Sequence, residues 1–365
     1  MPRKYKLIIS DLHIGSGQKP GHMNPWESFA QDDKFAEFLR FYSTDYFEDE
    51  EVELIIAGDF YDLLQVPIDG RFPDRITEPL AVRKIEACIE GHPKVHKALR
   101  DFVAQPKKRI VVLPGNHDYE WIFPKVQERF CEAIAGAPTS PLVHFVCDRE
   151  SYEFDGIQVQ HGMQFELHNY HNFREQLLRA NGAEPILNLP WGSIFILKAI
   201  TRLKEERPYI DKVRPFKAYF IRAIIFDPIF AIKVLLFAVW LFIRTRVLSL
   251  RHFGARLRQN WRMLKEADVY PDLVHNVRRH LEKHPEIGTL VLGHTHIPLV
   301  RRFEGDRRYV NTGCWTGTVS LEIESFGRES KPTYGYIEYP ENDDPPVVAL
   351  REWRGYHDLY RDIYF

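Results

Sequence analysis

The sequence has few cysteines, no long hydrophobic run and almost no net charge. Only 4 cysteines occur among 365 residues, without a Cys-x-x-Cys pair, which argues against a disulfide framework or a zinc finger and favours a reducing compartment. The amino-terminal residues lack the apolar core and cleavage site of a signal peptide, so we expect a cytoplasmic protein. The most apolar segment, residues 218–243, contains no uncharged run longer than residues 234–243, whereas a membrane-spanning helix needs about 20 apolar residues.

The near-zero net charge conceals two oppositely charged parts of the chain. The whole sequence has 49 Lys and Arg against 51 Asp and Glu, a net charge of −2. Residues 201–265 contain 15 basic and 4 acidic residues, a net charge of +11, so the remainder carries −13. Such a division predicts that the basic segment meets an anionic partner, and the alternative is a solvated basic face.

Short apolar runs alternate with helix-like stretches in the first 165 residues. Residues 6–9, 53–57 and 109–113 are rich in Ile, Val and Leu, as buried strands are. Apolar spacing predicts helices over residues 32–42 and 82–104. Asp155-Gly156 predicts a hairpin between residues 151–154 and 157–161. Further strands are predicted over residues 289–292, 298–303, 308–311, 318–323, 334–339 and 347–353. The alternation indicates an α/β fold.

Five polar motifs follow predicted strands. They are Asp11-Leu12-His13, Gly58-Asp59-Phe60-Tyr61-Asp62, Gly115-Asn116-His117-Asp118, His161-Gly162 and Gly293-His294-Thr295-His296. Because α/β folds place their chemistry at the carboxyl ends of strands, we expect these motifs to meet. A mixture of carboxylate, amide and imidazole ligands suits Mn²⁺, Fe or Zn²⁺ and is richer in nitrogen than a site for Ca²⁺ or Mg²⁺.

In this order, the motifs resemble those of the calcineurin-like metallophosphoesterases. The resemblance covers residues 1–165 and 286–365 and implies a four-layer αββα sandwich that holds two divalent metal ions. Mn²⁺ is the expected metal, with Fe or Zn²⁺ as alternatives. The family pattern implies that the first metal is bound by Asp11, His13 and His296, the second by Asn116, His161 and His294, and both by Asp59.

The same resemblance implies a reaction at phosphorus. Two metals polarise a phosphoryl oxygen and lower the pKa of water, and a proton donor assists the leaving group. His117 is the expected donor because it follows the implied ligand Asn116. Asp118 is expected to hold the imidazole of His117, and capping of a turn is the alternative role for Asp118. Asp62 completes its motif, and we assign it no ligand role.

Residues 166–285 interrupt the α/β pattern as a basic and apolar helical insertion, or cap. It resembles the insertion of the UDP-2,3-diacylglucosamine pyrophosphatases, which covers acyl chains beside the metals. The present insertion is longer, and that family commonly has Arg at the position of His117. On a helix over residues 244–265, an apolar arc of about 80° lies beside a basic arc of about 60°, as on helices that rest on anionic membranes. The cap residues expected to contact membrane or substrate are Arg244, Arg251, Arg258, Trp261 and Arg262.

We therefore predict a metal-dependent phosphoric ester hydrolase: a phosphatase, phosphodiesterase or pyrophosphatase. The basic and apolar insertion predicts a lipid-linked or amphiphilic substrate and peripheral attachment to the inner face of the cell membrane. The alternative is a nuclease or nucleotide phosphodiesterase whose arginines contact nucleic acid phosphates. A non-catalytic binding scaffold is a third interpretation, which the complete set of ligand residues disfavours.

Overall fold

The structure is a computed structural model. It describes residues 3–18, 21–179, 184–208, 210, 212–214, 222–243, 273–320, 327–329, 331–340, 344–356 and 360–363. The predicted helix over residues 244–265 lies outside the described residues, and so do its cap residues Arg244, Arg251, Arg258, Trp261 and Arg262.

A seven-stranded mixed sheet organises the two ends of the chain. Its strands, in spatial order, are β17 (Tyr360–Asp362), β16 (Val347–Trp353), β15 (Thr333–Tyr339), β1 (Lys4–Ile9), β2 (Glu51–Ala57), β3 (Lys108–Leu113) and β4 (Val143–Phe145). Strands β1 to β4 are parallel, and β15 joins β1 in antiparallel register with Ile8 opposite Gly335. The predicted strands of this sheet are confirmed, and β4 and β17 are additional.

A five-stranded sheet packs against the first one. Its spatial order is β11 (Leu299–Phe303), β12 (Arg307–Asn311), β10 (Thr289–Leu292), β6 (Ile157–Val159) and β5 (Tyr152–Phe154). The strands β6, β10 and β12 are parallel. The predicted hairpin joins β5 to β6, and Asp155 and Gly156 both have positive φ, as a tight hairpin turn requires.

Alternating side chains on the strands fill two separate layers of core. Ile8, Ile55 and Val111 point toward the second sheet, where they pack with Val159 and Val291. Their neighbours along the strands point to the opposite face, onto the helices. Both faces of the central strands are therefore buried, which explains their continuous runs of Ile, Val and Leu.

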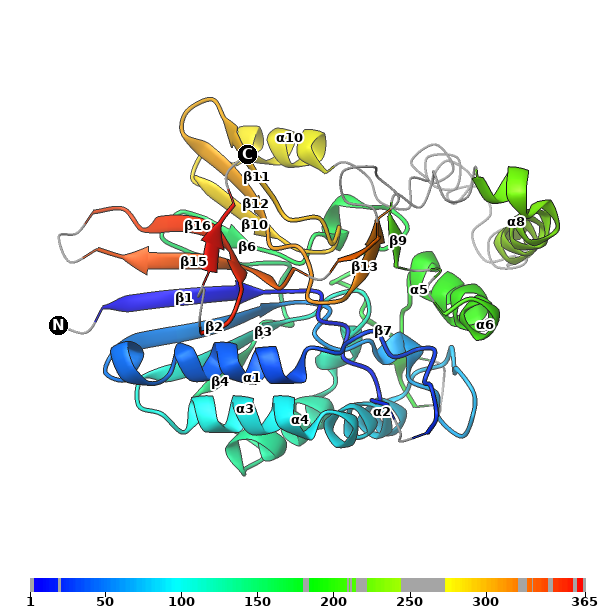
Figure 1. Cartoon of the computed structure of the whole chain (residues 1–365), viewed down its shortest axis with the longest axis horizontal. Helices are drawn as coiled ribbons and strands as arrows, with labels where there is room; N and C mark the ends of the chain where they lie inside the picture. The colour runs from blue at the N-terminus through cyan, green and yellow to red at the C-terminus, as the bar shows by residue number, and fades with distance from the viewer. Residues whose placement is uncertain are drawn as a thin grey trace.

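Helices cover both outer faces, which completes a four-layer αββα sandwich (Figure 1). The helices on the first sheet are α1 (Asp32–Phe41), α2 (Glu78–Gly91), α3 (Pro93–Val103) and α4 (Pro124–Ala135). Helix α10 (Val274–Lys283) packs its Val277 and Leu281 against Leu290 and Tyr309 of the second sheet. The α/β fold predicted from the sequence is confirmed.

The predicted helix over residues 82–104 is two helices in the structure. α2 ends at Gly91 and α3 begins at Pro93, with His92 between them in a non-helical conformation (φ −131°, ψ 61°). Proline has no amide hydrogen, and its ring disfavours helical geometry in the residue before it. Apolar spacing continues across this break, so periodicity alone does not detect it.

Short helices complete the loops of the sandwich. They are the 3₁₀ helices η1 (Asp45–Phe47), η2 (Leu63–Gln65), η3 (Tyr119–Ile122) and η4 (Met163–Phe165). Of these, η2, η3 and η4 each follow one of the polar motifs, so the chain turns sharply at the candidate site.

The described part of the predicted insertion contains helices and short strands. Besides α10, which packs on the second sheet, they are β7 (Leu177–Leu178), β8 (Ile186–Leu187), α5 (Trp191–Phe195), the π-helix η5 (Ile196–Ile200), α6 (Thr201–Glu206), β9 (Val213–Arg214) and α8 (Pro228–Phe242). Strand β9 pairs with β13 (Thr318–Ser320), which pairs with β14 (Gly327–Glu329). Helix α8 lies at the edge of the molecule (Figure 1). Among the described residues, no helix is both long enough and apolar enough to cross a membrane. The division at residues 165 and 286 stays a prediction.

Candidate metal centre

The five polar motifs follow the carboxyl ends of strands in two facing sheets. Asp11, Asp59 and Asn116 come after β1, β2 and β3, while His161 and His294 come after β6 and β10. The strands within each group are parallel, so their carboxyl ends lie at one edge of each sheet. The structure therefore brings together residues that lie up to 285 positions apart, such as Asp11 and His296, whose side chains are 3.3 Å apart.

Five of the residues in these motifs have a left-handed backbone conformation, which sets the direction of their side chains. Positive φ angles occur at Asp11 (56°), His13 (50°), Asp59 (52°), His294 (70°) and His296 (61°). Residues other than glycine rarely adopt this conformation, and it concentrates at functional sites. Gly58, with φ of 85°, precedes Asp59, and a Cβ atom there would stand 2.5 Å from Nδ1 of His161. Only glycine allows this turn to approach the imidazole so closely.

The first group of donor atoms consists of Asp11, His13 and His296. Oδ2 of Asp11 accepts hydrogen bonds from the Ser10 hydroxyl and from the backbone N–H of His294, the latter at 2.8 Å. Oδ1 is buried and has no hydrogen-bond partner, although Nε2 of His296 lies 3.3 Å and Nε2 of His13 3.8 Å away. These two imidazole nitrogens are 3.0 Å from each other. A divalent cation would give all three atoms a common partner.

The second group of donor atoms consists of Asn116, His161 and His294, and Asp59 lies between the two groups. Oδ1 of Asp59 accepts the backbone N–H of His117 at 2.8 Å. Oδ2 lies 3.3 Å from Nε2 of His161 and 3.7 Å from Nε2 of His13, so it faces both groups. Nε2 of His161 is also 3.1 Å from Oδ1 of Asn116.

The donor set fits divalent metal ions. Within each of three overlapping triplets, one donor atom from each residue lies within 4.8 Å of the others: Asp11, His13 and His296; His13, Asp59 and His117; and Asp59, His161 and His294. Asn116 adds an amide oxygen beside the third triplet. The orphaned Oδ1 of Asp11 is the sharpest test, because a buried carboxylate oxygen without a partner is costly unless a cation binds it.

Burial and charge oppose each other throughout this centre. Burial raises the pKa of Asp59, but the facing imidazoles of His161, His117 and His13 outweigh it and hold that pKa below its usual range. Burial lowers the pKa of His161, but Asp59 and Asp11 outweigh it and raise the pKa to about 10. The carboxylates are therefore ionised, the form in which they bind metal.

His117 stands at the rim of the centre and is held by Asp62. Nδ1 of His117 lies 2.8 Å from Oδ1 of Asp62, and its ring meets the ring of His13 edge-on at 4.6 Å. Burial lowers the pKa of His117, but the charges of Asp62 and Asp59 outweigh it and raise the pKa to about 9. His117 is thus favoured in its charged form, with Nε2 as the nitrogen not bonded to Asp62.

The expectation that Asp118 holds the imidazole of His117 is wrong. The fully buried carboxylate of Asp118 accepts backbone N–H groups from Asp59 at 3.1 Å, Phe60 at 2.8 Å, Tyr61 at 3.2 Å and Gly115 at 2.7 Å. These four bonds tie the turn after β2 to the turn after β3. Asp118 therefore has the turn-capping role, and Asp62 occupies the position beside the imidazole.

Sequence reasoning missed two carboxylates. Asp62 belongs to one of the five motifs, but its contact with His117 follows only from the turn through η2. Glu166, the first residue of the predicted insertion, has a buried side chain 2.9 Å from Nε2 of His294. Its only sequence signal is its position five residues after His161.

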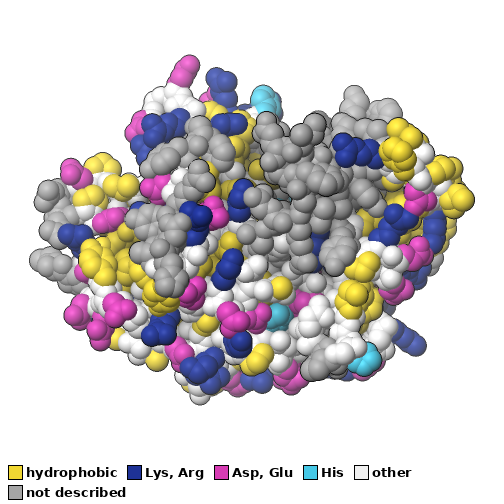
Figure 2. Space-filling model, in the orientation of Figure 1, with side chains coloured by type: hydrophobic (Ala, Val, Ile, Leu, Met, Phe, Trp, Pro, Cys, Tyr) yellow, Lys and Arg dark blue, Asp and Glu magenta, His cyan; other side chains and the backbone are white. Residues whose placement is uncertain are grey.

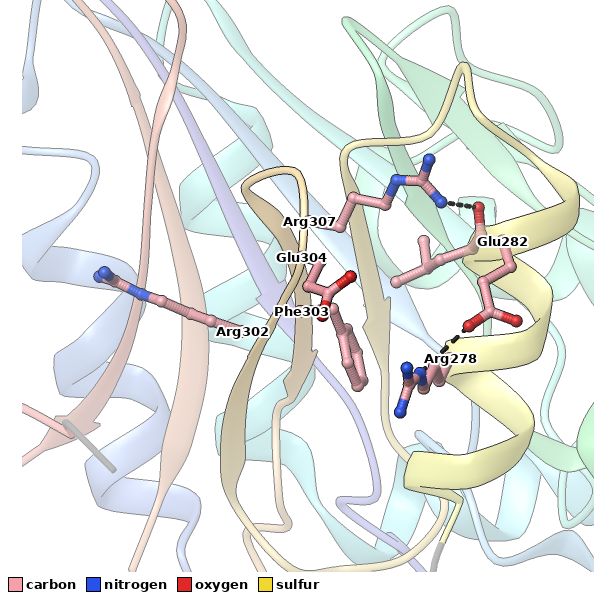
Figure 3. Close-up of a pocket in the computed structure, with 7 residues that line it drawn as sticks. Arg278, Glu282, Arg302, Phe303, Glu304 and Arg307 are labelled. Atoms are coloured by element: carbon pink, nitrogen blue, oxygen red, sulfur yellow. Dashed lines mark hydrogen bonds and ion pairs between the residues drawn. The ribbon is translucent and has the colours of Figure 1, made fainter.

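A cavity elsewhere in the molecule contains none of the candidate metal ligands. It has a volume of about 390 Å³ and lies between α10 and the β11–β12 hairpin (Figure 3). Because β12 begins at Arg307 and runs parallel to β10, the cavity lies at the end of the second sheet opposite to His294. Arg278 pairs with Glu282 at 3.1 Å, Arg307 donates to the Leu281 carbonyl, and Arg302 points away from the other lining residues (Figure 3).

Comparison with known proteins identifies one family. Residues 6–220, more than half of the chain, match the model of the calcineurin-like phosphoesterases. No curated protein matches the sequence.

Solved structures that are similar over most of their length include a predicted phosphoesterase from Streptococcus pneumoniae TIGR4 (12% identity, 100% of this chain and 98% of that chain, TM-score 0.31). Others are an archaeal phosphodiesterase (11% identity, 95% and 99%, TM-score 0.34) and Vps29 from Entamoeba histolytica (10% identity, 99% and 99%, TM-score 0.30).

Proposed function

The chain belongs to the calcineurin-like phosphoesterase family, and on that premise we propose that it hydrolyses phosphoester or pyrophosphate bonds with two divalent metal ions. The observation that carries the proposal is the position of Asp59, whose Oδ2 faces imidazole nitrogens of both donor groups. In this proposal Asp11, His13 and His296 bind one ion, Asn116, His161 and His294 bind the other, and Asp59 bridges them. Mixed carboxylate, amide and imidazole donors favour Mn²⁺ over Mg²⁺.

The protein supplies a proton donor beside these ligands. When bound, the metal ions polarise a phosphoryl oxygen and lower the pKa of the attacking water. Asp62 holds Nδ1 of His117 at 2.8 Å, which leaves Nε2–H to protonate the leaving oxygen as its bond to phosphorus breaks. Because the same contact favours the charged imidazole, His117 carries this proton at neutral pH.

We further propose that the substrate is amphiphilic and is met at a membrane surface. Helix α8 supports this proposal because large apolar side chains on it are exposed. Phe226 before the helix and Ile229 in its first turn are each 82% exposed, and Leu236 is 64% exposed. Positions 229, 232, 236 and 239 recur at spacings of three or four, and with positions 240 and 243 they share one face of the helix. Figure 2 shows hydrophobic side chains at the edge where α8 lies in Figure 1.

The opposite face of α8 attaches it to the protein. Phe230 packs with Leu203 and Ile210, and the guanidinium of Arg207 lies 4.0 Å above the Phe230 ring. Asp227 caps the helix by accepting the backbone N–H of Phe230 at 3.3 Å and also pairs with Arg207. Several exposed large apolar side chains on one helix face are unusual on a soluble monomer, and such a face suits contact with lipid. The net charge of +11 over residues 201–265 suits an anionic surface.

The alternative substrate is nucleic acid, which the same basic segment favours. Counter-ion release would then make affinity fall steeply with salt, with a logarithmic slope of about −0.9 for each phosphate contact on duplex DNA. The apolar face of α8 favours the lipid interpretation, because phosphate contacts need arginine and lysine rather than Ile, Leu and Phe.

An activity panel in the presence of Mn²⁺ tests the proposal. The substrates are a phosphomonoester, a phosphodiester, a nucleotide-sugar lipid in mixed micelles, and DNA, each assayed with and without chelator. We expect chelator-sensitive hydrolysis, fastest on the lipid substrate. Preference for DNA would favour the nuclease, and no metal-dependent hydrolysis of any phosphoester would contradict the proposal.

A further inference from the structure

Glu166 makes a buried contact with a candidate metal ligand that no motif accounts for. It directly follows η4, the short helix after His161-Gly162, and its side chain is 3% exposed. Its Oε2 lies 2.9 Å from Nε2 of His294. The same oxygen accepts a hydrogen bond from Nδ2 of Asn169 at 2.6 Å and lies 3.2 Å from Nε2 of His168.

The other imidazole of this donor group is restrained in a parallel way. Nδ1–H of His161 donates to the backbone carbonyl of Ala57 at 2.9 Å, so Nε2 is the nitrogen that faces Asp59 and Asn116. His294 has a carboxylate where His161 has a carbonyl. In each imidazole one nitrogen is therefore engaged by the protein outside the donor group, and the other is the nitrogen that a metal ion would bind as its proton is released.

We propose that Glu166 is a positioning residue for His294. By accepting the proton of Nε2, Glu166 fixes the tautomer in which Nδ1 carries the lone pair that binds a metal ion. The inference rests on the proposed function. It adds Glu166, the first residue of the predicted insertion, to the residues that shape the metal centre.

The arrangement around Glu166 makes it suitable for this role. Metal-bound histidines usually donate their second N–H to a carboxylate or carbonyl, which orients the ring and raises its basicity. Asn169 and His168 contact the same Oε2 and hold the carboxylate in one place. Gly162 keeps the intervening turn close, because a Cβ there would stand 3.0 Å from Cβ of His294.

Metal affinity measured on the full-length protein tests the inference. The variants are Glu166→Gln, which keeps the size and an acceptor oxygen, and Glu166→Ala, which removes the acceptor. Mn²⁺ is titrated against a chelating dye, and the spectrum of the bound ions is recorded by electron paramagnetic resonance. We expect Glu166→Ala to weaken one of two Mn²⁺ equivalents about 10- to 100-fold, with a smaller effect of Glu166→Gln. The signal of coupled ions should give way to that of isolated Mn²⁺ at subsaturating metal.

Two controls distinguish a specific effect on the metal centre from a general loss of charge or of stability. Glu286→Gln alters an exposed carboxylate 3.0 Å from His284, and we expect it to leave Mn²⁺ affinity unchanged. Thermal unfolding without metal reports a purely structural role of Glu166. Unchanged affinity for both ions in the folded Glu166→Gln and Glu166→Ala proteins overturns the inference while the proposed function stands. Absence of Mn²⁺ binding by the wild-type protein overturns the proposed function itself.

Discussion

At the scale of single residues, the candidate centre combines strained backbone with ordinary side chains. Asp11, His13, Asp59, His294 and His296 all have positive φ, which costs free energy at residues other than glycine. Asparagine and aspartate tolerate this conformation better than other residues. Asp59→Asn therefore changes the charge of the carboxylate without adding backbone strain, and it is a cleaner test of metal binding than Asp59→Ala.

Replacing His117 tests its role as a proton donor. We expect His117→Ala to keep its bound metal but to hydrolyse esters with poor leaving groups about 10²- to 10⁴-fold more slowly, because the leaving oxygen no longer receives a proton. Esters whose leaving groups are already acidic should be affected little. The measurement is kcat for a series of aryl phosphates of increasing leaving-group pKa, together with metal content. Equal losses across the series would contradict the assignment, and Asp62→Asn should show a weaker form of the same pattern.

Replacing Asp118 tests its structural role. Asp118→Ala leaves four buried backbone N–H groups without their acceptor, and each such group costs about 1–3 kcal/mol. We therefore expect a loss of several kcal/mol in the free energy of unfolding of the metal-free protein, measured by urea denaturation. Asp69→Asn, in an exposed pair with Arg83, is the matched control and should change stability by less than about 1 kcal/mol. Unchanged stability of Asp118→Ala would refute the role.

At the scale of secondary-structure elements, the periodicity of apolar residues predicts the strands and helices. It does not predict where the chain turns between them. The buried strands β1, β2 and β3 follow from their Ile, Val and Leu content, since a strand covered on both faces needs apolar residues throughout. The break between α2 and α3 at His92 follows from Pro93, which lacks an amide hydrogen. The contact between Asp62 and His117 depends on how η2 turns the chain, and no local pattern encodes that distance.

Helix α8 provides the test of the membrane proposal. We expect the double variant Ile229→Glu/Leu236→Glu to lose binding to anionic liposomes, because it places two charges on the exposed apolar face. Sedimentation with vesicles that contain an anionic phospholipid measures the bound fraction. Val347→Glu, at a 54% exposed apolar position on β16, adds a charge elsewhere and should bind as the wild type does. Wild-type protein that does not sediment with these vesicles would remove the membrane part of the proposal.

At the scale of the whole molecule, two sheets bring the ends of the chain together at one edge. The sequence predicts the α/β class from the alternation of strands and helices. It also predicts that the five motifs meet, because each motif directly follows a strand. The pairing of β1 with β15 and the facing of the two sheets are long-range contacts that a single sequence does not encode locally. For the same reason the sequence identified the candidate ligands but missed Glu166, whose contact with His294 spans 128 residues. The net charge of −2 is the sum of +11 over residues 201–265 and −13 over the rest of the chain.

The most direct test of the account is the metal content of the wild-type protein and of Asp59→Asn, measured by elemental analysis after dialysis against Mn²⁺ and paired with a phosphodiesterase assay. We predict two metal ions per wild-type chain, and for Asp59→Asn a loss of metal and activity together, because the carboxylate faces both donor groups. Asp69→Asn serves as the control with unchanged metal content. Asp59→Asn protein that hydrolyses the phosphodiester at the wild-type rate would contradict the two-metal account.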